Sequence, residues 1–324
     1  MERKKVLIIT SYYPPMGGPG CIKLVKHLKY MRDTGWEPVI LTPRDNTFFA
    51  WDDSMLKDVE GIRKYTFTNP DIGWLRSKLR RKTPKQEDRR WLAEKGKTSL
   101  SQTIQRFIWR NFLIPDGRIG WVWPLYFRAK QVIAEENPDL IYVRLPVWSM
   151  GIAARRIARS TGLPLVVDFD DEWTGDFNDF IEHPAFRKWI ERRMETRIVR
   201  QANIVLATTP AARDNFRTRY PDQPADKFRF VTMGFDPDDF ADMQPDRSDT
   251  DDNTFILTFL GTFHDKNEPV GFFITPIFIF KALQIIKQQY PERRIHFRIV
   301  GHMIEHLRHL VDDFDIADMV SITG

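Results

Sequence analysis

Continuous apolar runs alternate with helix-forming stretches along this chain, and this alternation limits its folds more than any other feature. The apolar runs of the first part have the length of single strands and lie at 5–10, 38–42, 139–145, 163–169, 202–209 and 227–233. Such runs are typical of parallel strands that are buried on both faces. Helical patterns fall between them, at 20–34, 123–136, 147–161, 184–200 and 210–219. The sequence therefore predicts a doubly wound α/β domain, with its ligand site at the carboxyl ends of the strands.

An acidic stretch divides the chain in two. Residues 235–253 hold eight Asp and one Arg, two prolines and no aliphatic periodicity, which are marks of a linker. Beyond it, strands are predicted at 255–263, at 294–302 and from Met319 onward, with helices over 272–290 and 303–314. We therefore expect a Rossmann-like domain over 1–240, an acidic linker over 241–253 and a partial second Rossmann-like domain over 254–324.

The cysteine count and the lengths of the apolar runs indicate the cellular compartment in which this protein works. The single cysteine, Cys21, excludes an intramolecular disulfide and is typical of a reducing compartment. The N-terminal apolar run is too short for a signal peptide. No run of about 18 apolar residues occurs, since the longest candidate, 271–283, is interrupted by Pro276 and Lys281. These features predict a cytoplasmic protein without a membrane-spanning helix.

The sequence SYYPPMGGPG, residues 11–20, connects the first predicted strand to the first predicted helix. Gly17, Gly18 and Gly20 would let the backbone approach an anion, and the helix N-terminus adds free N–H groups and a positive dipole end. Lys23 and Lys26 add positive charge on the first turns of that helix. The spacing is not G-x-G-x-x-G and no acidic residue ends the second strand, so a NAD-type site is not predicted. A phosphate-binding loop and a plain strand-to-helix turn both remain open.

Three acidic residues follow the strand predicted at 163–169. Asp168, Asp170 and Asp171 lie where the carboxyl edge of the sheet is expected. Close carboxylates can bind a sugar hydroxyl, act as a base or hold a metal; alternatively, they cap the next helix in solvent. The position favours a functional role. Since a strand-end carboxylate is expected to contribute little packing, Asp170→Asn is expected to lower turnover more than stability.

Two further motifs match only in part. HMIEH at 302–306, followed by His309, has the H-x-x-E-H spacing of a zinc site, but it lies beyond the acidic linker, where a solvated helix face is the simpler interpretation. EKGKTS at 94–99 ends like a phosphate-binding P-loop, but Trp91 stands where that loop requires glycine. Neither motif predicts a site, and no metal is expected.

A basic insertion is predicted at about 70–115. Residues 76–97 contain ten Lys/Arg against three Asp/Glu, a net charge of +7 that exceeds the +5 of the whole chain. Ile104, Phe107, Ile108 and Phe112 follow near helical spacing. A basic segment beside an amphipathic aromatic helix favours an anionic membrane surface. RNA phosphates and plain solvation remain alternatives; no nucleic-acid partner is expected.

Taken together, these stretches resemble family-4-like glycosyltransferases of the GT-B fold, in which two Rossmann-like domains face each other across a cleft. The matching segments run in order: 11–26, 30–43, 114–121, 137–146, 166–173, 202–210 and 233–240. The resemblance implies transfer of a sugar from a nucleotide diphospho-sugar to a glycan or lipid-linked acceptor, with retention of anomeric configuration. It also implies no metal or other cofactor, and a place in cell-envelope polysaccharide synthesis, peripheral on the inner membrane face.

The resemblance assigns roles to residues of the first domain. Gly17 and Gly18, with Gly20 and Lys23, would lie against the donor diphosphate, although relatives often carry Arg where Lys23 stands. Asp170 would be the catalytic residue, with Asp168 and Asp171 beside it, although many relatives read DFRD where this chain reads DFDD.

The resemblance also assigns residues beyond the acidic strand end. Gly234 and Asp236 would line the interdomain cleft, with Met233 where Asn is usual, and Lys266 would bind the diphosphate. No two glutamates within 254–324 are eight positions apart, as they are in relatives, so donor binding by these residues is expected to be incomplete. Two alternatives follow: a metal-dependent transferase with Asp168 and Asp170 as a DxD pair, and a catalytically incomplete protein that binds only an acceptor or a membrane.

Overall fold

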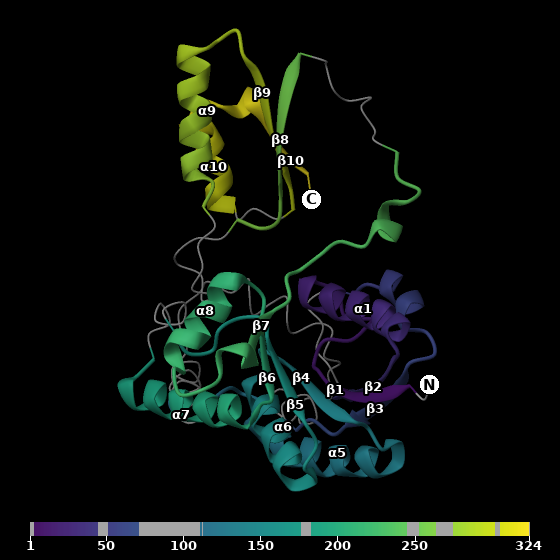
Figure 1. Cartoon of the computed structure of the whole chain (residues 1–324). Coiled ribbons are helices and arrows are strands. Elements are labelled where there is room, and N and C mark those ends of the chain that lie inside the picture. Colours follow the sequence, from purple (N-terminus) through teal and green to yellow (C-terminus); the bar gives the residue numbers. More distant parts are fainter. Residues whose placement is uncertain are drawn as a thin grey trace, which may run out of the picture. The chain divides into compact units, whose positions relative to one another are not determined.

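The computed structural model describes residues 3–44, 51–70, 111, 113–175, 183–244, 253–263, 275–301 and 305–323. The chain forms two compact units, Met1–Asp236 and Pro237–Gly324 (Figure 1). The first unit ends four residues before the predicted boundary at 240. Each unit is described by itself.

The first unit is built on a seven-stranded parallel sheet in the order β3-β2-β1-β4-β5-β6-β7. Its strands are β1 Lys4–Ile9, β2 Trp36–Pro43, β3 Arg63–Phe67, β4 Leu140–Leu145, β5 Leu165–Phe169, β6 Ile204–Ala207 and β7 Phe228–Phe230. The predicted doubly wound α/β fold is confirmed. The sequence pattern did not predict β3, because this edge strand has no continuous apolar run and begins with two exposed basic residues.

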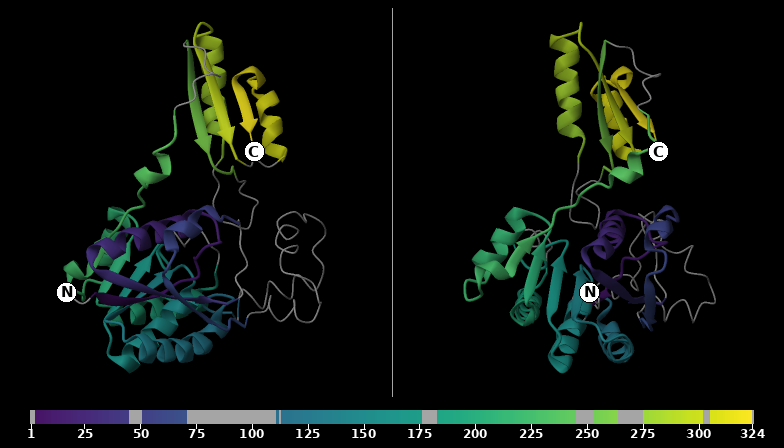
Figure 2. Two further views of the ribbon diagram at one scale, coloured as in Figure 1. Left: turned by 90° about the vertical axis from the view of Figure 1, so that its right-hand side faces the viewer. Right: turned by 45° about the vertical axis from the view of Figure 1, so that its right-hand side comes forward.

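Helices cover both faces of this sheet (Figure 2). The α-helices are α1 Pro19–Met31, α5 Val122–Glu136, α6 Trp148–Thr161, α7 Ala185–Gln201 and α8 Pro210–Arg219. The 3₁₀ helices are η1 Arg32–Thr34, η2 Ser54–Val59, η4 Ile119–Trp121 and η5 Ala225–Lys227. The predicted helices of this unit are confirmed to within a few residues at their ends.

Alternation along the strands separates two cores, because successive strand residues point to opposite faces. Val6 and Ile8 of β1 pack with Leu24 of α1 and Met55 of η2. Leu7 and Ile9 belong to a larger core that α5, α6, α7 and α8 complete on the other face. This division decides which strand residues meet α1, and it positions the candidate site.

The second unit contains a three-stranded parallel sheet in the order β10-β9-β8. Its elements are η6 Pro237–Phe240, β8 Thr254–Leu260, α9 Ile277–Gln289, β9 Arg294–Val300, α10 Glu305–Asp313, η7 Ala317–Met319 and β10 Val320–Thr323. Phe280 and Leu283 of α9 pack with Phe297 and Ile299 of β9 in a small core. The prediction of a second, smaller parallel unit is confirmed. Among the helices that the structure describes, none combines the length and the hydrophobicity that a membrane span requires.

Candidate functional site

The loop after β1 reaches α1 through Gly18. This residue has φ 103° and ψ 165° and caps α1 without a side-chain hydrogen bond. Its carbonyl accepts hydrogen bonds from the N–H groups of Cys21 and Ile22, at 3.0 and 3.1 Å. The first turn of α1 contains no acidic residue, so the positive end of the helix dipole has no acidic side chain of its own turn beside it.

Gly18 is required for its conformation rather than for space. Its φ and ψ lie in a region that is essentially restricted to glycine, while a Cβ placed there would meet no atom within 4 Å. We predict that Gly18→Ala lowers the free energy of unfolding by about 1–3 kcal/mol. Urea denaturation measures this, with Gly234→Ala as the control, since Gly234 has equally open surroundings and no positive φ. Equal losses in the two variants would contradict the assigned strain.

Gly20 leaves room for a neighbouring aromatic ring. A Cβ at this position would lie 3.0 Å from the ring of Tyr12. The Thr10 hydroxyl accepts a hydrogen bond from the Tyr12 N–H at 3.0 Å, and the Arg144 guanidinium lies 5.5 Å from the Tyr12 ring. Arg144 also donates a hydrogen bond to the Gly20 carbonyl. The loop is therefore fixed to the sheet by contacts that a larger residue at position 20 would crowd.

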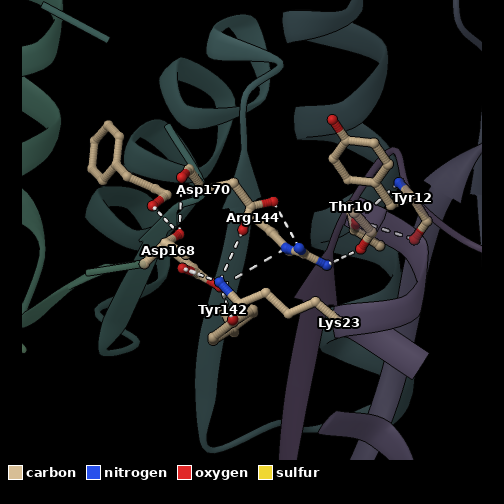
Figure 3. Close-up of polar contacts among 10 residues, drawn as sticks. Thr10, Tyr12, Lys23, Tyr142, Arg144, Asp168 and Asp170 are labelled. Carbon is tan, nitrogen blue, oxygen red and sulfur yellow. Dashed lines mark hydrogen bonds and ion pairs between the residues drawn. The ribbon is translucent and has the colours of Figure 1, made fainter. Parts of the chain in front are cut away.

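Four charged side chains meet beside this loop, at the carboxyl edge of the sheet (Figure 3). The Lys23 ammonium lies 2.9 Å from the Asp170 carboxylate and 3.4 Å from that of Asp168. The Arg144 Nη2 atom lies 2.7 Å from Asp170, and its Nε atom lies 3.9 Å from Asp168. We call these residues the ion cluster.

Strand alternation explains why these groups meet. Arg144 of β4 and Asp168 of β5 are register partners in neighbouring parallel strands, so their side chains point to the same face. That face is covered by α1, which supplies Lys23. Tyr142, two residues before Arg144, points the same way, and its hydroxyl donates a hydrogen bond to Asp168. Burial and the adjacent Asp168 charge raise the pKa of Tyr142 well above its usual value.

The ion cluster is deeply buried and balanced in formal charge. The exposed fractions of the Lys23, Arg144 and Asp168 side chains are 1%, 1% and 0%, and that of Asp170 is 17%. Two cations facing two carboxylates avoid the high cost of an unpaired buried charge. This position favours a supporting role for Lys23 and Asp168 over the direct substrate contacts that the sequence predicts for them.

Asp171 differs from its two acidic neighbours. It is exposed, and no residue that the structure describes donates a hydrogen bond to its carboxylate or forms an ion pair with it. Partial desolvation, followed by repulsion from Asp170, raises its pKa above the usual value of 3.8. Of the three acidic residues predicted for this strand end, Asp171 is therefore the one with a carboxylate available to a substrate.

Another buried carboxylate, that of Asp236, lies at the end of the first unit. It is 2% exposed, and its oxygens lie 2.7 Å from the Lys29 ammonium and 3.0 Å from that of Lys26. The Tyr30 hydroxyl donates a hydrogen bond to it at 2.6 Å. Lys26 also pairs with Asp58 at 2.7 Å. Two carboxylates therefore balance the charge of Lys26, and it does not add positive charge to the glycine loop.

The remaining predicted site residues fall into two groups. Gly17 is buried in the loop and Gly234 lies in an open segment, so neither placement tests its predicted contact. Lys266, most of the basic insertion, His302 and the side chain of His306 lie outside the described residues. A hollow of about 220 Å³ lined by Arg3, Arg32, Glu37 and Arg63, among others, lies at the opposite, amino-terminal edge of the sheet, away from the ion cluster and Asp171.

Sequence reasoning missed Tyr142 and Arg144. The available signal was their alternation with Ile141, Val143 and Leu145: polar residues at every second position of a strand that otherwise appears fully apolar. Such a pattern indicates a polar partner on one face of the sheet.

Comparisons with known proteins agree with this architecture. A family model described as "Glycosyl transferase 4-like domain" matches residues 27–234. No curated protein matches the chain significantly. HepE of Anabaena, solved in complex with UDP, is 17% identical with a TM-score of 0.53, over 99% of this chain and 69% of that chain. The trehalose-6-phosphate phosphatase N-terminal domain of Candida albicans is 8% identical with a TM-score of 0.55, over 99% of this chain and 72% of that chain. At these identities the two structures show a shared fold.

Proposed function

The chain belongs to the glycosyl transferase 4-like family and has a fold of the GT-B type, and from this premise we propose that it transfers a sugar from a nucleotide diphospho-sugar. The proposed acceptor is a glycan or a lipid-linked sugar, and the proposed outcome is retention of anomeric configuration. The similar HepE structure contains UDP, which supports a nucleotide-sugar donor here.

The observation that carries the proposal is the exposed Asp171 carboxylate beside the buried ion cluster. In transfer, the bond between the anomeric carbon and the diphosphate oxygen breaks, and the acceptor oxygen forms a new bond to the same carbon. The acceptor hydroxyl must also lose its proton. In this proposal Asp171 accepts a hydrogen bond from that hydroxyl and takes its proton. Its raised pKa improves it as a base relative to an ordinary aspartate.

The leaving diphosphate carries the charge that develops during transfer. Backbone N–H groups and the positive end of a helix stabilise such charge when they are fixed in advance. The loop of Gly17, Gly18 and Gly20 before α1 supports this role, because Arg144 and Tyr12 hold it in place. Asp170 acts as a positioning residue for Arg144 in this arrangement.

A metal-dependent reaction through Asp168 and Asp170 is the alternative that the sequence left open. Both carboxylates already face Lys23 and Arg144 at salt-bridge distance. A divalent cation would have to displace these two cations, at a cost in buried charge. The donor set therefore supports transfer without a metal.

The test of this proposal is a single-turnover assay with labelled UDP-, GDP- and TDP-sugars, with and without EDTA. We predict release of nucleoside diphosphate from at least one donor, with a rate that EDTA leaves unchanged. Loss of activity in EDTA and its recovery with Mg²⁺ or Mn²⁺ would instead support the DxD alternative. No release, together with no nucleoside diphosphate binding by calorimetry, would leave a protein that binds only an acceptor or a membrane.

We also propose that the protein works at the inner face of a membrane, in synthesis of an envelope polysaccharide. The family resemblance supports this placement, and so does the proposed lipid-linked acceptor, which would be confined to a bilayer. Fractionation of cells into membrane and supernatant, with a salt wash of the membranes, tests it. A peripheral protein would be recovered with membranes and released by salt.

A further inference from the structure

One surface of the first unit combines exposed aromatic rings with guanidinium groups. Trp123 and Phe127 on α5 are 54% and 60% exposed, and Trp189 on α7 is 56% exposed. The Arg156 guanidinium lies 4.6 Å from the Trp123 ring, and that of Arg193 lies 4.1 Å from the Trp189 ring. Large apolar side chains that remain exposed together with basic groups indicate an interaction surface.

This surface is continuous across three helices. Arg156 of α6 reaches Trp123 of α5, and Arg155 of α6 donates a hydrogen bond to the Arg197 carbonyl of α7 at 3.2 Å. Trp189, Arg193 and Arg197 follow each other at four-residue intervals, so they share one face of α7. Figure 1 shows α5, α6 and α7 as one layer against the sheet. We call this surface the arginine–tryptophan face.

Its positive charge is not balanced within the described helices α6 and α7. The acidic residues of these two helices are Glu191 and Glu195, and both are buried in pairs with Arg187 and Arg219. Burial, and then repulsion from Arg159, Arg197 and Arg156, lowers the pKa of Arg155. Like charges held this close are a cost to the folded chain, and an anionic partner would relieve it.

We infer that the arginine–tryptophan face docks the protein on an anionic lipid bilayer. Tryptophan rings partition favourably to the headgroup region of a bilayer, and arginine side chains at the same depth bind lipid phosphates. A single-stranded nucleic acid would require free ring faces for base stacking. Here Arg156 lies over Trp123, which also stacks on Phe127 at 6.0 Å, and Arg193 covers a face of Trp189. Because these ring faces are already covered, the surface is better suited to binding lipid headgroups than to stacking nucleic-acid bases.

The position of the aromatic residues relates this face to the candidate site. Helices that connect parallel strands run against the strands, so α5 and α7 begin at the carboxyl edge of the sheet. Trp123, Phe127 and Trp189 all lie in the first two turns of these helices. Docking would thus bring the edge that carries Asp171 close to the bilayer. The inference rests on the membrane placement proposed above and names its surface. Because its test measures binding and not turnover, it can fail while the proposed sugar transfer holds.

The test is co-sedimentation of the whole chain with vesicles of phosphatidylcholine alone and of phosphatidylcholine mixed with phosphatidylglycerol. We expect binding only to the mixed vesicles, weakened by salt. The double variant Arg156→Glu, Arg193→Glu should bind at least about 25-fold more weakly, at about fivefold for each basic group removed from an anionic surface. The double variant Lys57→Glu, Lys64→Glu changes net charge equally, and both lysines are exposed. Lys57 lies on η2 and Lys64 lies over the Tyr13 ring, and both η2 and Tyr13 belong to the core on the opposite, α1 side of the sheet. This variant should bind almost as the parent does.

A third variant, Trp189→Ser, separates insertion from charge and should also reduce binding to mixed vesicles. Thermal melting of every variant checks that the fold is kept. Equal weakening by the two double variants would overturn the inference in favour of general charge attraction. Unchanged binding of the arginine variant would overturn it in favour of another segment, and tighter binding to single-stranded RNA than to mixed vesicles would overturn it in favour of nucleic acid.

Discussion

Replacing Lys23 with methionine is expected to lower the free energy of unfolding by about 3–5 kcal/mol. The change keeps most of the side-chain length and removes the ammonium, so Arg144 alone would face Asp168 and Asp170 in the buried ion cluster. A carboxylate left without its cation in a dry site is costly, because neither water nor another charge replaces the lost partner. Urea denaturation of the variant and the parent measures the loss.

The control is Lys57→Met, since Lys57 is exposed and such surface changes usually alter stability by about 0.5 kcal/mol or less. The double variant Lys23→Met, Asp170→Asn removes one cation and one carboxylate, and it should recover part of the loss through restored charge balance. A loss for Lys23→Met no larger than that of Lys57→Met would contradict the ion cluster.

Replacing Asp171 with asparagine is expected to lower kcat/KM by about 10²–10⁴-fold, the usual contribution of a general base. The free energy of unfolding should change by about 0.5 kcal/mol or less, because the side chain is exposed and makes no hydrogen bond or ion pair with a described residue. The exposed Asp226→Asn serves as the control, with activity close to that of the parent.

The pH dependence of the parent provides a second readout for Asp171. A base works when it is deprotonated, so activity should fall as pH drops through the raised pKa of Asp171, above the usual 3.8. Stability should change in the other direction. A carboxyl whose pKa is raised by folding holds its proton more tightly when folded, so it favours the folded state as pH falls through that range. Asp171→Asn should remove both effects; an unchanged acid limb would exclude Asp171 as the base.

Much of the fold could be predicted because the strands carry their signal locally. Runs such as 5–10 and 202–209 are apolar on both faces, which identifies buried parallel strands without knowledge of their partners. Strand β3 carries no such signal, since Arg63 and Lys64 are exposed at the edge of the sheet. It forms a strand because it pairs with β2, which lies about 20 residues earlier in the chain.

The candidate site was predictable only in part. Asp168, Asp170 and Asp171 could be placed at a carboxyl edge because they end a recognisable strand. Their separate roles depend on Lys23, which comes from α1 and lies 145 positions before Asp168. No local pattern shows which carboxylate such a distant cation will meet.

The expectation that Asp170 contributes little to stability does not hold for the same reason. Lys23 and Arg144 lie 2.9 and 2.7 Å from its carboxylate. Asp170→Asn would leave two buried cations with one remaining carboxylate, so its effect on stability should be large. For this reason we propose Asp171, and not Asp170, as the carboxylate whose removal lowers turnover without lowering stability.

The most direct test of this account compares Asp170→Asn and Asp171→Asn for both turnover and the free energy of unfolding, on the same preparations. The account predicts that Asp171→Asn loses turnover by about 10²-fold or more while keeping its stability. It predicts that Asp170→Asn loses several kcal/mol of stability, about 3–5 kcal/mol for a broken buried pair. Full turnover in Asp171→Asn, or parental stability in Asp170→Asn, would contradict the division of roles at this strand end.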